Sequence, residues 1–210
     1  MAVYVPQHFA ARDEAMVARL VRDYPFATLV TPGEPETFVT PLPLLLVADG
    51  EPHGTVFGHF ARGNAHAKTQ PGAESVAIFH GPHAYVTPSW YADPANAVPT
   101  WNYAVVHAHG ALELAGDPKE TRAVLDLLVE RFESNRTAPW QLGLDPERLA
   151  AMVNAIVGFR IRVTRLEAKF KLSQNRSPED QRRVAAGLDG EGYAEAEATA
   201  AWMKDVNGAK

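Results

Sequence analysis

Four polar side chains occupy alternate positions directly after a short apolar run: Arg62, Asn64, His66 and Lys68. No acidic residue occurs between residues 54 and 73. The first turn of a helix exposes backbone N–H groups, and nearby Arg and Lys side chains add positive charge and donors that suit phosphate oxygens. This spacing therefore favours an anion site, and the alternative is a solvated turn.

A second donor-rich segment, residues 169–176, reads KFKLSQNR and contains no acidic residue. Lys171, Ser173, Gln174 and Asn175 all carry N–H or O–H groups that can donate hydrogen bonds. The segment is able to bind a polar ligand or a loop of a partner chain. An ordinary solvated strand end explains the same composition equally well.

Residues 81–110 are the aromatic part of the chain, with two of the four Trp, three of the six Tyr and only one acidic residue, Asp93. The triplet Trp101, Asn102 and Tyr103 lies within it. Aromatic rings with polar edges suit a surface that binds a flat ligand or a partner chain. Strands whose aromatic side chains fill a core are the alternative.

Two other patterns indicate chemistry more weakly. His107 and His109 lie two apart on a predicted strand and face one side with Glu113, so a metal site is one interpretation and ordinary hydrogen bonding the stronger one. Ser89 lacks the Gly-x-Ser-x-Gly pattern of a hydrolase nucleophile. We expect no metal and name no catalytic residue.

Composition excludes several classes of protein. The 210 residues include no Cys, which rules out disulfides and thiolate chemistry. The net charge of −5 argues against a large nucleic-acid surface, although direct DNA contact stays open. No apolar run approaches the roughly 20 residues that span a membrane, and the start lacks a signal-peptide pattern, so we expect a cytoplasmic protein.

The elements that position these residues are short strands followed by helices. Predicted strands cover residues 26–31, 37–47, 54–60, 75–80, 84–87, 100–114 and 156–172. Predicted helices cover residues 13–22 and 65–69, begin after the N-caps Asp117, Asp145 and Ser177, and include a tail from residue 192 to 204. Short turns between successive strands predict antiparallel pairing, and hence a β-barrel with peripheral helices. Pro41 and Pro43 place the second strand at an edge, or break it.

Several motifs in order resemble the PaiB family, described as FMN-binding negative transcriptional regulators. They are Tyr4-Val5-Pro6 with His8-Phe9, His59 to Asn64, Gly81 to Tyr91, Val98 to Tyr103, and Lys169 to Arg176. The resemblance runs from residue 1 to about residue 188. The family usually has Ala-Asn-Pro where this chain has Gly63-Asn64-Ala65.

The resemblance implies an α+β, mainly β, FMN-binding split barrel of antiparallel, Greek-key type, related to pyridoxamine-phosphate oxidase. It implies a homodimer with FMN in a cleft between subunits. We expect residues 1–190 to form this domain and residues 191–210 a helical tail. In this fold the phosphate is generally held near the third strand and the turn after it, which here is the stretch from His59 to Lys68.

The predicted cofactor-binding residues come from this stretch and from the aromatic and donor-rich segments. They are His59, Arg62, Asn64, His66, Lys68, Trp101, Asn102, Tyr103, Lys171, Ser173, Gln174 and Asn175. The leading hypothesis is a flavin- or redox-linked regulator. The alternatives are a flavin-dependent oxidoreductase on the same barrel, a repressor that contacts DNA directly, and a structural dimer that has lost its FMN site.

Overall fold

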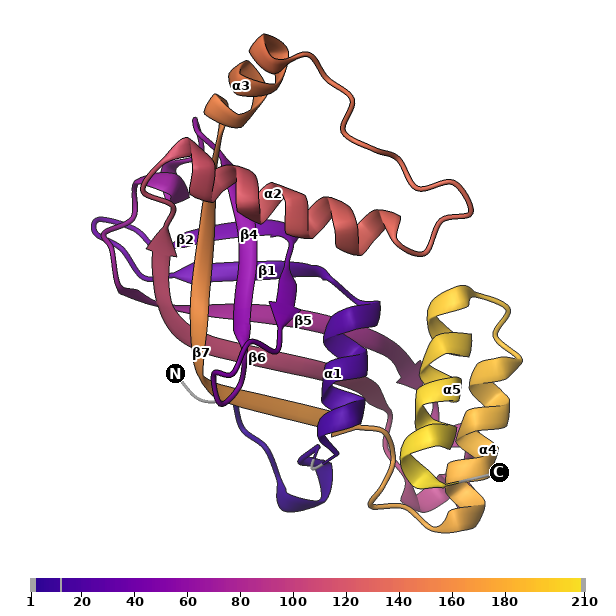
Figure 1. Cartoon of the computed structure of the whole chain (residues 1–210). Helices are drawn as coiled ribbons and strands as arrows, with labels where there is room; N and C mark the ends of the chain where they lie inside the picture. The colour runs from indigo at the N-terminus through magenta and orange to yellow at the C-terminus, as the bar shows by residue number, and fades with distance from the viewer. Residues whose placement is uncertain (1–2, 12, 209–210) are drawn as a thin grey trace. The chain divides into compact units, whose positions relative to one another are not determined.

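The computed structural model describes residues 3–11 and 13–208 (Figure 1). The strands are β1 (Phe26–Thr31), β2 (Phe38–Pro43), β3 (Leu45–Val47), β4 (Thr55–Ala61), β5 (Ala73–Val86), β6 (Thr100–Leu114) and β7 (Ile156–Lys171). The α-helices are α1 (Glu14–Asp23), α2 (Pro118–Glu133), α3 (Pro146–Asn154), α4 (Pro178–Asp189) and α5 (Ala194–Asn207). Single 3-10 turns cover η1 (Gln7–Phe9), η2 (Ala65–Lys68), η3 (Pro88–Trp90) and η4 (Pro94–Asn96).

Helix starts agree with the predictions from the sequence. Side chains of Asp117, Asp145 and Ser177 each accept a hydrogen bond from a backbone N–H in the first turn of α2, α3 and α4. A proline follows each cap, where its missing N–H costs nothing. These three boundaries are therefore set by local chemistry.

The seven strands form one antiparallel sheet in the order β2-β1-β5-β6-β7-β4-β3. Only Leu44 separates β2 from β3, although these are the two edge strands. Seven strands spaced about 4.8 Å apart would hold the edges of a flat sheet roughly 29 Å apart, whereas two Cα steps reach at most about 7.6 Å. The sheet must therefore curl until its edges meet, which is the predicted barrel.

Leu44 makes this passage between the edges. Its backbone N–H donates to the carbonyl of Pro25 at 2.8 Å, and its side chain is buried. Pro41 and Pro43 are exposed on edge strand β2, where a missing N–H disturbs no inner ladder. The prediction of an edge strand or a broken strand is confirmed in both respects.

One strand prediction is wrong. The two strands predicted over residues 75–80 and 84–87 are one continuous strand, β5, which ends at Val86, and Gly81-Pro82 is not a turn. A Cβ at Gly81 would lie 2.7 Å from Leu20 Cδ1 and 3.1 Å from the Ala104 carbonyl oxygen. The glycine therefore allows close packing inside a strand, and the Gly-Pro pair is no reliable sign of a turn here.

The chain divides into two compact units. Unit 1 contains residues 3–11, 13–23, 80–106 and 167–208, and unit 2 contains residues 24–79 and 107–166. Strands β5, β6 and β7 contribute residues to each unit. All seven strands are represented in unit 2, which contains β1 to β4 whole and parts of β5, β6 and β7.

The interior of unit 2 is aromatic. The rings of Phe60 on β4 and Phe159 on β7 stack with centroids 4.4 Å apart, and each side chain is 1% exposed. Helix α2 packs against β4 and runs across it (Figure 1). The Thr121 hydroxyl of α2 accepts a hydrogen bond from the Gly158 N–H of β7 at 3.2 Å. Gly158 leaves room for this approach, because a Cβ there would lie 3.0 Å from the Thr121 Cα.

Helices α4 and α5 pack side by side in unit 1 (Figure 1). Trp202 on α5 is 3% exposed, with its ring edge against Phe170 and the guanidinium of Arg19 4.7 Å from its centroid. Arg19 on α1 also pairs with Asp205 at 2.5 Å. These contacts attach the C-terminal helix to the rest of unit 1.

Candidate functional site

The turn after β4, in unit 2, contains the first predicted anion site. The Arg62 guanidinium donates to the backbone carbonyls of Asn154 and, at 2.8 Å, of Ile156. The Arg62 backbone N–H also donates to the Ala155 carbonyl at 2.8 Å. Arg62 therefore ties this turn to the start of β7, and part of its guanidinium is already committed within the protein.

His66 is a core residue of unit 2. Its side chain is 1% exposed, and its ring nitrogens lie 2.9 Å from Thr40 Oγ1 and 2.7 Å from Thr31 Oγ1. Burial lowers the pKa of His66 to about 4, so the imidazole is neutral at pH 7. It contacts the Phe60 ring at 4.6 Å rather than offering positive charge to a ligand.

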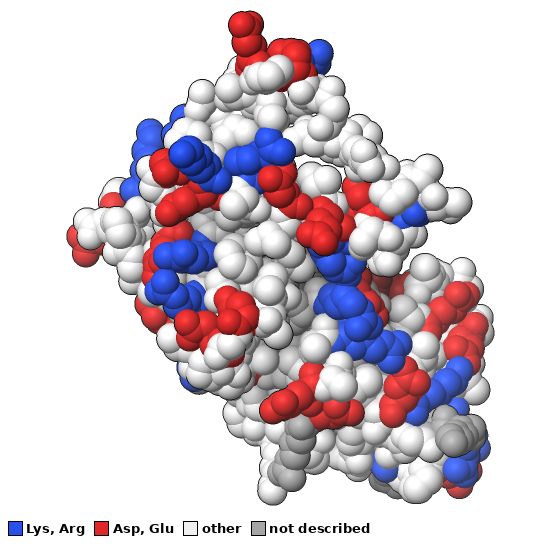
Figure 2. Space-filling model, in the orientation of Figure 1, with Lys and Arg blue, Asp and Glu red and all other residues white. Residues whose placement is uncertain are grey.

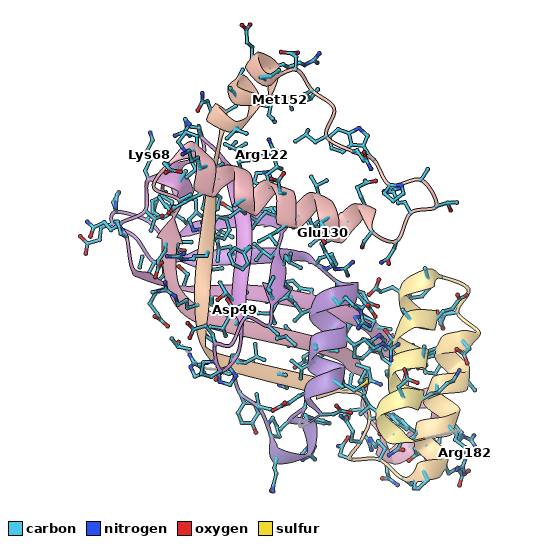
Figure 3. All side chains as sticks on the ribbon, viewed as in Figure 1. Asp49, Lys68, Arg122, Glu130, Met152 and Arg182 are labelled. Carbon is cyan, nitrogen blue, oxygen red and sulfur yellow. The ribbon has the colours of Figure 1, made fainter. Side chains whose placement is uncertain are left out.

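The other predicted residues of this turn divide between local and exposed roles. The Asn64 side chain caps η2 by accepting from the His66 N–H at 2.9 Å, so it already satisfies an N–H group that an anion would use. Lys68 is exposed on the same short turn (Figure 3). His59 is half-buried on β4, burial lowers its pKa, and its Nδ1 has no hydrogen-bond partner among the described residues.

The triplet at the start of β6 is divided between two cavities of unit 1. Trp101 and Tyr103 line one cavity, and Thr100 and Asn102 line the other. Successive side chains of a strand point to opposite faces of the sheet. The structure therefore separates Asn102 from the two aromatic residues with which the sequence groups it.

We call the first of these the aromatic cavity. It has a volume of about 360 Å³ and is lined by His80, Gly81, His83, Trp101, Tyr103, Ala104 and Val105. Trp101 is 53% exposed, and its ring lies 6.1 Å from that of His83 and 6.2 Å from that of Tyr85. Burial, followed by the charge of His83, lowers the pKa of His80. This is an open aromatic surface with two imidazoles.

We call the second the cationic cavity. It has a volume of about 140 Å³ and is lined by Phe9, Tyr91, Val98, Thr100, Asn102, Lys171, Ser173, Asn175 and Arg176. Four of the predicted residues, Asn102, Lys171, Ser173 and Asn175, meet here. Two of the nine lining side chains are cations and none is acidic, so the cavity suits an anionic or electron-rich group.

Asn102 and Ser173 form the floor of the cationic cavity. The Asn102 amide donates to Ser173 Oγ at 3.0 Å and to Met203 Sδ at 3.1 Å, and the Ser173 hydroxyl can donate back to Asn102 Oδ1 at 3.3 Å. Ser173 has a φ of 66°, a left-handed conformation that costs a non-glycine residue about 1–3 kcal/mol. This strained turn lies at the residue whose hydroxyl lines the cavity.

Gln174 has a structural role in the same turn. Its side-chain oxygen accepts from the Leu172 N–H at 2.7 Å, and its amide donates to the Phe170 carbonyl. Gln174 therefore closes the turn that presents Ser173 and Asn175. Its prediction as a ligand contact stays a prediction.

Lys171 is the half-buried cation of the cavity. Its ammonium donates to Thr100 Oγ1 and to the Trp101 carbonyl. Burial, followed by the charges of Lys169 and Arg176, lowers the pKa of Lys171. The Lys171 ammonium therefore lies where positive charge is crowded.

Five residues that line the cationic cavity were not among the predicted cofactor-binding residues: Phe9, Tyr91, Val98, Thr100 and Arg176. Tyr91 and Arg176 both line it, with the Arg176 guanidinium 4.5 Å from the centroid of the Tyr91 ring. Arg176 ends the donor-rich segment, so its composition was a usable signal. No spacing in the sequence brings residue 91 to residue 176.

The carboxylate predicted for the alternative metal site, Glu113, has other partners. Glu113 on β6 accepts hydrogen bonds from Arg160 at 2.8 Å and from Arg162 at 2.6 Å, both on β7. This bridge between neighbouring strands occupies both carboxylate oxygens. The structure therefore gives Glu113 a structural role.

Comparison with solved structures defines the class of protein. The flavocytochrome Anf3 from Azotobacter vinelandii has a TM-score of 0.59 at 16% identity, with 80% of this chain and 72% of that chain covered. An FAD- and heme-binding protein from Mycobacterium smegmatis has a TM-score of 0.59 at 17% identity, covering 84% and 79%. The fold is the α+β split barrel of flavin-binding proteins.

The chain belongs to the family described as "Putative FMN-binding domain", whose model matches residues 3–165. It is also 34% identical over 206 residues to the Bacillus subtilis protein named "Protease synthase and sporulation protein PAI 2", with 97% of each chain covered. The PaiB resemblance is thus confirmed, and FMN is the cofactor that the family description names. The matched segment ends before Lys171, so part of the cationic cavity lies outside it.

The residues of unit 1 fit a flavin. The aromatic cavity lies within the range of about 300–1,000 Å³ that is usual for ligand pockets. The cationic cavity adds hydrogen-bond donors and the buried Tyr91 hydroxyl, which has no partner among the described residues. Among residues 3–11 and 13–208, no helix is long and apolar enough to span a membrane.

Proposed function

We propose that the protein is an FMN-binding homodimer of the PaiB type that acts as a flavin- or redox-linked regulator in the cytoplasm. Family membership supports the flavin, and the PaiB resemblance supports the regulatory role. The observation that carries the proposal is the aromatic cavity, because its size and rings suit a flat heterocycle.

In this proposal Trp101 and Tyr103 contact the isoalloxazine ring. Bound FMN would supply reversible one- and two-electron chemistry, and the chain would hold and orient it. His80 and His83 offer ring nitrogens at the same cavity. The lowered pKa of His80 keeps this imidazole neutral at pH 7, so it is able to accept or donate a hydrogen bond without adding charge.

Exposed apolar side chains support the homodimer. Tyr85, Val98 and Trp101, all in unit 1, are 44%, 67% and 53% exposed. The rings of Tyr85 and Trp101 lie 6.2 Å apart, and neighbouring exposed apolar side chains are typical of surfaces that bind a partner chain. Light scattering of the purified protein at several concentrations measures the mass directly, and a monomer with bound FMN would contradict this part of the proposal.

Regulation through a partner or through the flavin state fits the surface charge better than a wide DNA-binding face. On the face drawn in Figure 2, groups of Lys and Arg side chains adjoin Asp and Glu side chains. Arg160 and Arg162 pair with Glu113, and Arg19 pairs with Asp205. Phosphate binding by a protein needs uncompensated cations. Salt-dependent, sequence-specific binding of a promoter fragment would support the DNA-contacting alternative.

The experiment that tests the proposal is a titration of the purified protein with FMN, followed by visible absorbance and flavin fluorescence. We expect saturable binding that Trp101→Ala weakens by about 3- to 10-fold, the usual strength of an aromatic pair. Trp140→Ala is the matched control, because Trp140 is 51% exposed and lines neither cavity. Absence of any flavin binding would remove the proposal.

A flavin-dependent oxidoreductase is the second candidate, favoured by the two imidazoles of the aromatic cavity. His80 and His83 are suitable groups for proton transfer next to a bound ring. Repeated oxidation of NADH or NADPH by the FMN-loaded protein would favour this function. Flavin that is reduced once without turnover would favour the regulator.

A further inference from the structure

The cationic cavity concentrates positive charge without a counter-ion. Lys171 and Arg176 line it, and Lys169 lies two residues before Lys171 on the same strand. In the described part of the chain none of these three cations makes an ion pair, and none of the nine lining residues is acidic. Like charges at partly buried positions repel each other, and an anion between them would relieve the repulsion.

Tyr91 provides an independent sign of a ligand. The residue is 2% exposed, and its hydroxyl has no hydrogen-bond partner among the described residues although it is buried. Buried hydroxyl groups in folded proteins nearly always have a partner. Tyr91 also lines the cationic cavity, so a group bound there would lie beside this residue.

Lys171 and Arg176 both have N–H groups that are available to a ligand. An ammonium has three N–H groups, and Lys171 uses two of them on Thr100 and the Trp101 carbonyl. The Arg176 guanidinium lies against the Tyr91 ring at 4.5 Å, which leaves its N–H edge available for a bidentate contact. Preorganised cations of this kind bind a ligand without first losing side-chain freedom.

The size of the cavity limits what it holds. Its 140 Å³ is below the range of about 300–1,000 Å³ of pockets that hold whole small molecules. One liquid water takes about 30 Å³, so the cavity has room for a group of a few heavy atoms. A phosphate has this size, and its oxygens can accept hydrogen bonds from several directions at once.

We propose that the cationic cavity is a binding site for a phosphate-sized oxyanion, held by Lys171, Arg176 and the hydroxyl of Tyr91. Ser173 and Asn175 supply further donors at its wall. The site is made wholly of unit 1 residues, so it differs in composition from the predicted anion site at Arg62. The proposal rests on the proposed function where the oxyanion is the flavin phosphate, and inorganic phosphate tests the site apart from FMN.

Calorimetric titration with inorganic phosphate tests the site. We expect saturable binding to the full-length protein, weakened at least 10-fold by Lys171→Met and about 3- to 10-fold by Tyr91→Phe. Tyr91→Phe keeps the buried ring and so protects the fold, which circular dichroism would verify. Arg182→Met is the matched control, since Arg182 is an exposed cation of α4 (Figure 3) that does not line the cavity. Equal phosphate affinity in all four proteins, or no saturation, would overturn the proposal.

Parallel titrations with FMN and riboflavin, which differ by one phosphate, identify the source of the oxyanion. If Lys171→Met weakens FMN but not riboflavin, the flavin phosphate occupies the cationic cavity. If Arg62→Ala weakens FMN but not riboflavin, and Lys171→Met instead abolishes only the binding of inorganic phosphate, the cavity takes a separate phosphorylated ligand. Either result supports the site. A protein that binds no flavin would refute the proposed function and leave the phosphate titration as a valid test.

Discussion

The protonation of His66 is coupled to folding. Burial lowers its pKa from the ordinary 6.5 to about 4. Between these two pH values the unfolded chain binds a proton that the folded chain excludes, so the free energy of unfolding falls as the pH falls. The loss is on the order of 3 kcal/mol and is complete near pH 4.

Urea unfolding at pH 7, 5.5 and 4 measures this loss. In His66→Gln the contribution of this imidazole disappears, and the decline in stability between pH 6.5 and 4 becomes shallower by about the same 3 kcal/mol. His53→Gln is the matched control, because His53 is exposed in the same unit. A decline as steep in His66→Gln as in the wild type would show that the buried imidazole is not the cause.

The chemical role of a single residue, such as that of a donor, was easier to predict from the sequence than the residues that it contacts. Lys171, Ser173 and Asn175 were expected to serve as donors, and they share one cavity with Asn102. His66 was expected at an anion site because its position alternates with other polar residues, yet it lies in the core. Local spacing does not reveal that the Thr31 and Thr40 hydroxyls, far away in the sequence, bind both ring nitrogens.

At the scale of elements, the pairing of β6 with β7 depends on a close approach at Gly110. A Cβ at this position would lie 2.0 Å from the Arg162 carbonyl oxygen and 2.9 Å from Ile161 Cγ2. Since backbone atoms of a paired strand cannot move aside, we expect Gly110→Ala to lower the free energy of unfolding by at least about 2 kcal/mol.

Gly63→Ala is the matched control for this substitution. A Cβ at Gly63 meets no atom within 4 Å, and its φ is not in the left-handed region. Alanine there restricts the unfolded chain, so we expect a gain of about 0.4–1 kcal/mol in stability. Denaturant titrations of the two variants beside the wild type give both values, and similar stabilities would contradict the close-approach argument.

Elements with local signals were predictable, and elements set by distant contacts were not. Helices α2, α3 and α4 begin where Asp and Ser caps with following prolines placed them. Strand β5 was divided in two because Gly81-Pro82 usually marks a turn, whereas packing against Leu20 and Ala104 keeps the strand continuous. Strand order also depends on long-range pairing, so only the antiparallel barrel class was predictable.

At the scale of the whole molecule, the open question is whether the last twenty residues are a separable tail. The boundary after residue 190 stays a prediction from the resemblance. Within unit 1, α5 places Trp202 and Met203 in the interior, and Asn207 donates to the Leu172 carbonyl at 3.0 Å. Met203 also contacts Asn102 at the floor of the cationic cavity. These contacts indicate that α5 stabilises unit 1 and its cavities.

Trp202→Ala tests this role of α5. Removal of a buried indole should cost about 3–5 kcal/mol, and it should weaken phosphate binding at the cationic cavity because it loosens the helix that holds Met203 against the Asn102 side chain. Glu197→Ala, on the exposed side of the same helix, should leave both quantities unchanged. Thermal unfolding and calorimetry measure them. If Trp202→Ala unfolds like the wild type and binds phosphate equally well, α5 is a separable tail.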